Sequence, residues 1–470
     1  MDLYIFNTKT REKEKFKPQK PPWVGLYTCG PTVYDYAHIG NMRAYVFSDI
    51  LRRVLEFNNF KIRHVMNITD VGHLVSDADE GEDKVVLEAR KQKKTPYEIA
   101  EFYTDVFFRH SAKLNIKDPT IACKATDHIQ EMIDFVKVLV DNGYAYEISD
   151  GIYFDISTFP NYGQLSGIDL EEQREGARVE VNPEKRHPAD FALWKKAPKN
   201  HIMQWPSPWG MGYPGWHIEC SAMGLKYLDA FFDIHTGGVD HIPIHHENEI
   251  AQNWGFKGRE IVKYWVHSEF LQVDGGKMAK SLGNFYTLDD IEEKGYDPIA
   301  FRYFLLNAHY RKKVNFTWEA LQGAQKAIER LTEHVLKFKE APPMEGGEPG
   351  LEGYRKSFKE AVNDDLNVPR AIALIWDILR GEEPSQDYYQ FLLECDRVLG
   401  LGLAEMEKKG EEEISEEIRE LIERREEARK KRNWAEADSI RDQLLEKGIR
   451  LMDTPEGVRW EKIKGGENND

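Results

Sequence analysis

Residues 24–41 read VGLYTCGPTVYDYAHIGN, and this stretch decides the fold. It opens as a short apolar run that stops at Cys29, where Gly30 and Pro31 are typical of the end of a strand. Past Asn41 the hydrophobic period lengthens to that of a helix. One apolar face of this helix is formed by Ala44, Phe47, Leu51, Val54 and Leu55. The pattern predicts a strand, a tight turn and a helix.

The turn holds His38, Ile39 and Gly40 directly before the predicted helix. A helix N-terminus has unpaired N–H groups and a partial positive charge, so it is suited to bind phosphate. Gly40 would let a flat ring or a backbone come close, and His38 would offer a proton donor to a phosphate oxygen. The simpler interpretation is that His38 only caps the helix.

Residues 61–67 predict a second strand, so strand, helix and strand follow one another within about 45 residues. Such a unit indicates an α/β fold with a parallel, Rossmann-like sheet, whose ligands bind beyond the carboxyl ends of the strands. No G-x-G-x-x-G follows the first strand, which argues against a dinucleotide-dependent dehydrogenase.

A second candidate phosphate site lies far downstream, where residues 276–284 read GKMAKSLGN. This glycine-flanked loop carries Lys277 and Lys280. Two ammonium groups are suited to a polyphosphate that gains charge during a reaction. Taken alone, the loop is equally well interpreted as a solvated turn.

Composition predicts a folded protein of two to four domains, because 470 residues exceed the size of one core. No apolar run approaches the roughly 18 residues that a membrane span needs, and the polar residues 1–20 do not resemble a signal peptide. Four cysteines without disulfide-like spacing suit a reducing cytoplasm. The net charge of −17 argues against a nucleic-acid partner, although binding depends on local basic patches.

Metal-binding residue types occur in three separate segments. Cys29 ends the first strand, and Cys220 closes the segment GWHIEC. His245 and Glu249 lie four apart in HHENE, so they share one face of an apparent helix, although His246 with Glu249 is also a permitted pair. Two thiolates, an imidazole and a carboxylate suit zinc. From spacing alone, buried structural cysteines and a polar helix face are the better interpretation.

The order of these patterns predicts several domains. Residues 1–121 and 201–287 form two halves of the catalytic α/β domain, and an insertion at 122–200 contains a helix and a hairpin. Residues 288–403 predict a helical bundle. A charged linker then leads to a small domain at 414–470 with two amphipathic helices.

The small domain contains a basic run, RREEARKKR, at residues 424–432. On an otherwise acidic chain, this run is the clearest candidate for binding nucleic-acid phosphates. The candidate residues are Arg424, Arg425, Arg429, Lys430, Arg432 and the nearby Trp434. The alternative is a solvated helix face with ion pairs between residues four apart.

Together and in this order, the two phosphate-binding candidates resemble the HIGH and KMSKS signatures of class I aminoacyl-tRNA synthetases. Within that class the chain is similar to the cysteinyl-tRNA synthetases over nearly its whole length, from Leu3 to about Trp460. The resemblance is carried by the segments CGPTVYD, PSPW, GWHIECSAM, HHENEIAQ, KSLGNF and NDDLN.

The resemblance implies an ATP-dependent activation of L-cysteine and its transfer to the 3′ end of tRNA(Cys). One Zn²⁺ per chain would be bound by the residues that match the family's ligands, Cys29, Cys220, His245 and Glu249. The positions that match the cysteine pocket are Cys29, Thr69, Trp216 and Asp240. ATP, accompanied by Mg²⁺, would bind His38, Gly40, Asn41, Lys277 and Lys280. Of these, His38, Lys277 and Lys280 would serve catalysis, and the basic run would bind tRNA.

The sequence departs from the class signatures at two positions. Asn41 stands where the second histidine of HIGH is expected, so this position cannot carry positive charge. Ala279 stands in KMAKS and lacks the usual hydroxyl, while both lysines remain. These departures concern the rate of adenylation and the shape of the loop rather than the class of reaction.

Three rival functions stay open. A related ligase could adenylate cysteine and deliver it to an amino sugar, although the basic helix argues against such a small acceptor. A zinc hydrolase could use His245 and Glu249, but Lys277 and Lys280 would then have no role in the reaction. A non-catalytic tRNA-binding protein would have little reason to keep the thiolates and lysines. We expect a cytoplasmic monomer that does not bind membranes.

Overall fold

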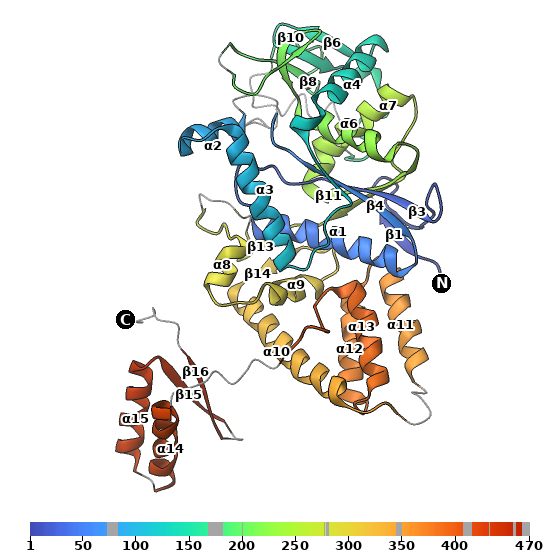
Figure 1. Ribbon diagram of the computed structural model, residues 1–470. Helices are drawn as coiled ribbons and strands as arrows, with labels where there is room; N and C mark the ends of the chain where they lie inside the picture. The colour runs from blue at the N-terminus through green and yellow to red at the C-terminus, as the bar shows by residue number, and fades with distance from the viewer. Residues whose placement is uncertain are drawn as a thin grey trace. The chain divides into compact units, whose positions relative to one another are not determined.

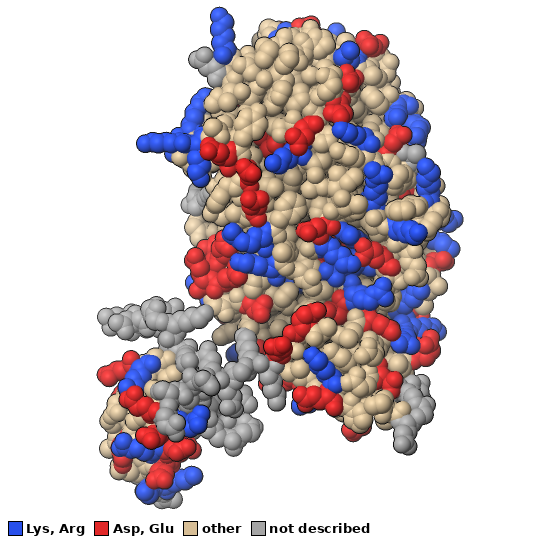
Figure 2. All heavy atoms as spheres, viewed as in Figure 1, with Lys and Arg blue, Asp and Glu red and all other residues tan. Residues whose placement is uncertain are grey.

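The computed structural model describes residues 1–72, 83–167, 182–199, 201–276, 278, 282–344, 350–407, 416–431, 433–454 and 457–462. The chain forms two compact units, Met1–Met406 and Glu407–Asp470. Lysine and arginine are interspersed with aspartate and glutamate over the face drawn in Figure 2, so no single sign of charge dominates that face.

A five-stranded parallel sheet organises the first unit (Figure 1). The strands in spatial order are β12 (Tyr264–Ser268), β11 (Phe232–Gly238), β3 (Trp23–Thr28), β4 (Lys61–Ile68) and β5 (Ile121–Lys124). In the register of the sheet, Leu26 aligns with Ile234 on one side and with His64 on the other. This arrangement confirms the predicted Rossmann-like α/β fold.

The chain changes direction between the two central strands. From β3 it passes through α1 (Ile39–Phe57) to β4, whereas from β11 it passes through α7 (Glu247–Lys257) to β12 on the other side. In open α/β sheets, ligands bind in the crevice at such a switch point, beyond the carboxyl ends of the strands. The segment after Thr28 lies at this crevice.

β3 is buried on both faces, as its nearly continuous apolar sequence requires. Val24 and Leu26 share a hydrophobic cluster with α1. Tyr27 points into a second cluster, which also contains residues of α4 (Ile129–Asp141), α6 (Trp216–Leu228) and α7. The sheet is therefore enclosed between two layers of helices.

The insertion forms a second, antiparallel sheet of five strands, in the order β6-β7-β8-β10-β9. The strands are β6 (Ala145–Ile148), β7 (Gly151–Phe154), β8 (Phe191–Lys196), β10 (Gly210–Pro214) and β9 (Trp205–Ser207). The predicted hairpin is β6–β7. Because β10 pairs with β8, this sheet continues past the predicted limit at residue 200, and the limit at 121/122 falls inside β5.

The remaining elements of the first unit are mostly helical. Two short strand pairs are β1 (Tyr4–Asn7) with β2 (Glu12–Lys15), and β13 (Leu271–Val273) with β14 (Val314–Phe316). The helices are α2 (Lys84–Gln92), α3 (Pro96–Lys113), α8 (Leu288–Glu293), α9 (Pro298–Leu306), α10 (Trp318–Glu340), α11 (Leu351–Asn363), α12 (Val368–Gly381) and α13 (Gln386–Leu399).

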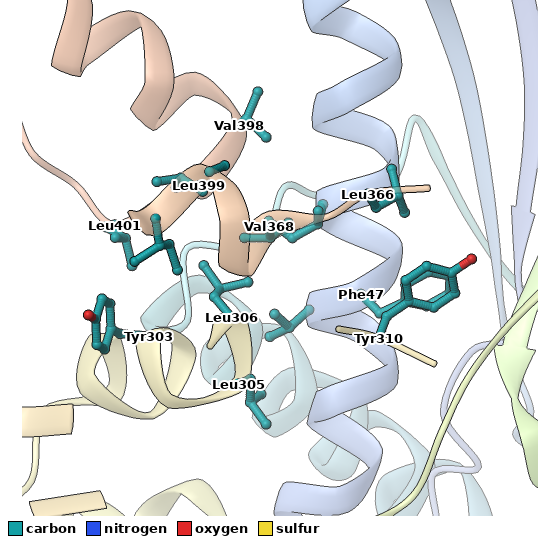
Figure 3. Packing of buried hydrophobic residues seen from close by; sticks show 14 of the residues in the cluster. Phe47, Tyr303, Leu305, Leu306, Tyr310, Leu366, Val368, Val398, Leu399 and Leu401 are labelled. Atoms are coloured by element: carbon teal, nitrogen blue, oxygen red, sulfur yellow. The ribbon is translucent and has the colours of Figure 1, made fainter. Parts of the chain in front are cut away.

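The helices after residue 288 share one hydrophobic core with α1. Figure 3 shows Leu305 and Leu306 of α9, Val368 of α12 and Leu399 of α13 gathered around α1. On α1 itself, Phe47 stacks on Tyr310 with ring centroids 4.6 Å apart. The predicted bundle is therefore continuous with the catalytic sheet rather than a separate compact unit.

A buried ion pair crosses this interface. The Arg302 guanidinium is fully buried, and its Nη2 donates to Asp49 Oδ2 of α1 at 2.6 Å. It also donates to the carbonyl oxygens of Leu399 and Leu114, at 2.7 and 2.9 Å. Burial opposes ionisation of Asp49, but Arg302 and Arg53 outweigh that effect and lower its pKa. The pair is fully hydrogen-bonded, as a buried pair must be.

The second unit contains α14 (Glu416–Lys430), α15 (Trp434–Glu446) and the hairpin of β15 (Ile449–Thr454) with β16 (Gly457–Lys462). Its core is formed by Ile418, Leu421, Ile440, Leu444 and Ile449. These residues include the apolar faces predicted for two amphipathic helices. A search of the described helices finds no candidate for a bilayer crossing.

We predict that Arg302→Met lowers the free energy of unfolding of the first unit by about 3 kcal/mol, because it leaves the buried Asp49 carboxylate with Arg53 as its remaining cationic partner and frees two buried carbonyl oxygens of their donor. The measurement is urea unfolding followed by tryptophan fluorescence. The matched control is Arg52→Met, which removes a partly exposed pair with Glu56 and should cost less than about 1 kcal/mol. Equal losses of unfolding free energy in the two variants would show that the buried pair contributes no more to stability than the partly exposed pair.

Candidate active site and metal centre

His38 is the N-cap of α1, and it forms a reciprocal pair of hydrogen bonds with Asn41. The Asn41 N–H donates to His38 Nδ1 at 3.0 Å, and the His38 N–H donates to Asn41 Oδ1 at 3.1 Å. Burial lowers the pKa of His38, which keeps the ring neutral. Because Nδ1 accepts a hydrogen bond, the ring proton is on Nε2. Capping and a donor role are therefore compatible.

Gly40 makes room for the His38 ring. A Cβ atom at this position would lie 2.9 Å from two atoms of the imidazole, which is too close for any other residue. Gly40 also lines the larger cavity, and the close approach of a ligand's ring there stays a prediction. The His38 ring is held from another side by Phe285, with perpendicular rings 5.2 Å apart.

Two cavities adjoin at the N-terminus of α1. The larger, of about 560 Å³, is lined by Thr28, Cys29, Gly40, Gly237, Gly238 and residues of β13. The smaller, of about 350 Å³, is lined by Tyr34, Tyr36, Trp216, Ile244 and His245. Both are lined by His38, Asn41, Tyr45, Asp240 and His241. Paired cavities of this size suit a nucleotide and a small second substrate.

Lys277 and Lys280 lie outside the described residues, and so does Ala279. Met278, between them, is described and lines the larger cavity. Its terminal methyl group is 3.6 Å from the position that a Cβ on Gly40 would occupy. Met278 therefore lies at the N-terminus of α1, and the roles of the two lysines stay predictions.

The four predicted metal ligands come together from four elements. Cys29 follows β3, Cys220 lies on α6, His245 lies in a π-helical turn at Ile242–His246, and Glu249 lies on α7. Their ligand atoms all lie within 4.8 Å of one another, and all four residues are buried. The Cys29 and Cys220 sulfurs are 3.9 Å apart, and His245 Nε2 lies 3.4 Å from Cys220 Sγ and 3.1 Å from Glu249 Oε1.

A second set of four donors shares two members with the first. Cys29 and Glu249 also lie within 4.8 Å of His235 and His246. His246 Nε2 is 3.2 Å from Cys29 Sγ, and His235 Nε2 is 2.9 Å from Glu249 Oε2. The geometry is therefore compatible with either His245 or His246 as a ligand, as the spacing had left open.

Opposite charges organise this buried cluster. Burial opposes ionisation of Cys29, but Cys220 and the neighbouring histidines hold its pKa well below the usual value. Burial likewise opposes ionisation of Glu249, yet His235 and His245 lower its pKa to about 2. Burial also opposes protonation of His245, but Cys29 and Glu249 outweigh that effect and raise its pKa to about 10. Anionic donors around one cation fit a thiophilic divalent metal such as zinc.

Sequence analysis missed four histidines of this cluster. His217 Nδ1 lies 3.0 Å from His245 Nδ1, and His267 Nε2 lies 2.7 Å from His246 Nδ1. Such contacts hold an imidazole in one orientation. His235 and His267 lie on β11 and β12, and His241 lines both cavities. A signal existed, since a histidine within a buried parallel strand requires a polar partner.

The predicted cysteine-pocket residues separate into two groups. Trp216 and Asp240 line the smaller cavity, and the Trp216 ring lies 4.4 Å from the His245 ring. Thr69 is buried and lines neither cavity. Its hydroxyl donates to Glu219 Oε2 at 2.7 Å and accepts from Asn67 at 3.0 Å. In this structure Thr69 supports the wall of the site.

The basic run is only partly available on the surface. Arg424, Arg429 and Lys430 lie on α14, and Trp434 at the start of α15 is 58% exposed. The prediction for Arg425 is wrong, because its side chain is 5% exposed and belongs to the interior of the second unit. Arg432 lies outside the described residues.

Both interpretations of the run find support in the geometry. Lys431 pairs with Glu427 at 3.3 Å, one helical turn away, as a solvated helix face would. Arg424 lies 3.7 Å from Glu436 of α15. Such exposed pairs are weak, so these cations can exchange their partners for phosphates.

Comparisons with known proteins agree with this geometry. Residues 15–326 match the family described as "tRNA synthetases class I (C) catalytic domain", and residues 411–460 match "Cysteinyl-tRNA ligase anticodon binding domain". Cysteine–tRNA ligase 1 of Burkholderia lata is 47% identical over 462 residues, which cover 98% of this chain and 97% of that protein. The cysteine–tRNA ligase of Thermus thermophilus is 44% identical and covers 98% of this chain and 99% of its own length.

A solved structure supports the fold independently. Mycobacterium tuberculosis methionyl-tRNA synthetase, in complex with methionyl-adenylate, aligns with a TM-score of 0.55 at 15% identity. The alignment covers 81% of this chain and 90% of that one. Fold and site together define a class I aminoacyl-tRNA synthetase. Within this class, the chain belongs to the cysteine–tRNA ligase family.

We predict that His38→Asn separates capping from catalysis. Asparagine is a favourable N-cap, so the free energy of unfolding should change by less than about 1 kcal/mol. The Nε2–H donor is lost, however, and adenylate formation should slow by about 10²–10³-fold. The measurements are urea unfolding and the single-turnover rate of adenylate formation. A wild-type rate in this variant would reduce His38 to a helix cap.

Proposed function

We propose that this protein is a cysteine–tRNA ligase that activates L-cysteine with ATP and transfers it to tRNA(Cys). The proposal is carried by the position of four buried metal donors, two of them thiols, at the carboxyl edge of the sheet. They lie beside the N-terminus of α1, whose unpaired N–H groups suit phosphate. Near-complete similarity to cysteine–tRNA ligases of several bacteria supports the same conclusion.

ATP would bind in the larger cavity, with its phosphates at the N-terminus of α1. Because the Asn41 N–H donates to Nδ1 of His38, the ring's only proton is on Nε2, where it would be available to a ligand. Lys277 and Lys280, with Mg²⁺, would balance the charge that builds on the phosphates. The carboxylate of cysteine would attack the α-phosphorus and release pyrophosphate. Catalysis would thus come from orientation and charge stabilisation.

Cysteine would bind in the smaller cavity, whose lining includes Trp216, Asp240 and the metal donor His245. An ammonium group would find a carboxylate in Asp240, and Trp216 would close the pocket around the short side chain. When bound, Zn²⁺ would supply a soft coordination position that takes a thiolate in preference to a hydroxyl. Rejection of serine by shape alone is worth only about 10²-fold.

After activation, cysteine would pass from the adenylate to the terminal ribose of tRNA(Cys), at the 2′-hydroxyl as in other class I enzymes. The match of residues 411–460 to an anticodon-binding domain supports tRNA as the acceptor and disfavours an amino sugar. Arg424, Arg429, Lys430 and Arg432 are the candidates for phosphate contacts, and Trp434 offers an exposed ring. We further propose that the protein is cytoplasmic, since four free cysteines suit a reducing compartment. We also propose that it is a monomer.

A zinc hydrolase would use the same donors differently. It needs one metal position open to water and a base beside it. The cavities beside these donors lie at the N-terminus of α1, whose unpaired N–H groups suit a polyphosphate, which a hydrolase of this kind would not need. This surrounding chemistry favours the ligase.

We predict that ATP–pyrophosphate exchange requires cysteine, with serine and alanine near background, because only a thiolate is a good soft ligand. Charging of tRNA(Cys) should follow in the same preparation. The measurement is exchange across a panel of amino acids, followed by aminoacylation with tRNA or an amino sugar as acceptor. Equal exchange with serine would contradict the selection by metal, and amino-sugar charging would favour the rival ligase.

We predict one zinc per chain, which is lost or loosened in Cys220→Ser and in His245→Ala. The matched control is Cys123→Ser, since Cys123 is also buried but belongs to neither donor set. We expect His246→Ala to keep its metal, because the resemblance assigns His245. Elemental analysis of the purified variants decides this. Metal loss confined to His246→Ala would move the ion to the second donor set.

A further inference from the structure

The turn between α2 and α3 carries a basic cluster that none of the roles above uses. Four of the five residues 90–94 are cationic, and all four are exposed: Arg90, Lys91, Lys93 and Lys94. Figure 2 shows Lys and Arg side chains gathered at the left edge, where Figure 1 places α2. On a chain with a net charge of −17, a local cluster of this kind determines where an anion can bind.

Part of this charge is not neutralised by neighbours. Lys91 pairs with Glu88 at 3.2 Å. Lys93 and Lys94 form no ion pair with any residue of the described ranges. Glu98, the next acid along the chain, is held by the N–H and hydroxyl groups of Thr95 at the start of α3. Two exposed ammonium groups thus stand ready for an external anion.

Aromatic rings lead from this turn into the active site. Lys94 Nζ lies 5.2 Å from the centre of the Phe102 ring, which is 41% exposed. The Phe102 ring lies 6.3 Å from Tyr36 at an interplanar angle of 85°. Tyr36 in turn lines the smaller cavity, together with His38 and Trp216. The contacts are therefore continuous from the basic turn to the proposed cysteine pocket.

A second lysine and ring lie on the same route. Lys84 Nζ is 5.5 Å from the centre of the Tyr34 ring, and both residues line the smaller cavity. Tyr97, the second residue of α3, is 52% exposed. Exposed rings beside lysines are the combination that binds single-stranded nucleic acid, through base stacking and phosphate contacts.

The rings are not explained by the packing of the hairpin alone. Tyr103, which lies on the inner side of α3, is buried with Val85 and Ile99 in the core of the hairpin. Tyr36 meets its ring at 5.2 Å. Phe102 lies outside this cluster: its ring meets that of Tyr103 at 5.1 Å, and the residue is 41% exposed.

We propose that this α2–α3 edge, formed by Lys93, Lys94, Phe102, Tyr36 and Lys84, receives the unpaired 3′ nucleotides of tRNA. Lys93 and Lys94 contact the phosphates, and the rings of Phe102 and Tyr36 stack against bases. The proposal rests on the proposed function, since the terminal ribose must reach an adenylate in the adjoining cavity. α3 itself carries exposed Glu101 and Asp105, so the phosphate contacts are assigned to the turn and to Lys84.

Duplex RNA and protein partners fit this edge less well. A duplex hides its bases from aromatic side chains, whereas unpaired nucleotides present their faces. An acidic peptide would use the lysines but would gain little from rings that continue into the catalytic cavity. The direction of the path, from solvent to the site of transfer, suits a flexible strand with a reactive end.

The test compares three variants with the wild type, namely two double variants and one single variant. Lys93→Glu/Lys94→Glu reverses the charge of the turn. The matched control, Lys20→Glu/Lys61→Glu, reverses two exposed lysines at the amino-terminal side of β3 and β4, away from the carboxyl edge that holds the site. Like Lys94, both control lysines lie over aromatic rings, at 5.8 and 5.6 Å. Phe102→Leu is the third variant, because it removes the ring and keeps an apolar side chain.

Two RNAs are used: tRNA(Cys), and the same tRNA without its unpaired 3′ nucleotides. We expect Lys93→Glu/Lys94→Glu and Phe102→Leu to weaken binding of the intact tRNA by about 10-fold or more. Binding of the shortened tRNA should change less than 2-fold, as should both affinities in the control variant. Cysteine-dependent pyrophosphate exchange should persist in all variants, which shows that they are folded.

Other outcomes overturn the proposal in distinguishable ways. Equal weakening for intact and shortened tRNA would assign the cluster to the duplex or to long-range attraction. Unchanged binding of both RNAs would leave the edge for another partner, such as an acidic peptide. Failure of the wild type itself to exchange pyrophosphate with cysteine would refute the proposed function instead, before the edge is tested.

Discussion

The burial of α1 is the constraint on which the rest of the structure depends. Thirteen of its 19 residues are buried, because the parallel sheet covers one side and the helices after residue 288 cover the other. Its polar residues must therefore be paired inside the protein. Arg43 donates to the carbonyl oxygens of Phe270 and Lys312, beside β13 and β14. Helix α1 is thereby tied to the segments beside β13 and β14.

The candidate metal centre imposes a second constraint, because its donors come from three segments of the chain that are far apart in sequence. Buried thiols and a buried carboxylate are costly unless a cation accompanies them. Cys29 and Glu249 raise the pKa of His245, so without an ion this imidazole is the group that favours the compensating positive charge. The surrounding imidazoles thus keep the cluster compact and oriented, and a divalent ion can replace their charge without rearranging the fold.

The sequence predicted those parts of the protein that local periodicity controls. The β3–α1–β4 unit was recognised because its hydrophobic period changes at His38. His235 was missed, since a strand buried on both faces has no alternation that would make a polar residue conspicuous. Arg425 was misassigned because a basic run shows charge but not which side of the helix faces the core. The sheet partner of β10 depends on a long-range register that no local pattern contains.

Two finer points depend on backbone geometry that spacing cannot supply. Spacing allowed both His245 and His246 to face Glu249, and their Nε2 atoms lie 3.1 and 3.9 Å from its Oε1; the π-helical turn that holds the two histidines could not be predicted from that spacing. Asn41 seemed to weaken the signature by removing a charge. Its amide and backbone instead fix the orientation and tautomer of His38. If phosphate binds at this helix end as we propose, it would meet a pre-oriented neutral donor together with the helix N–H groups, and positive charge would have to come from elsewhere.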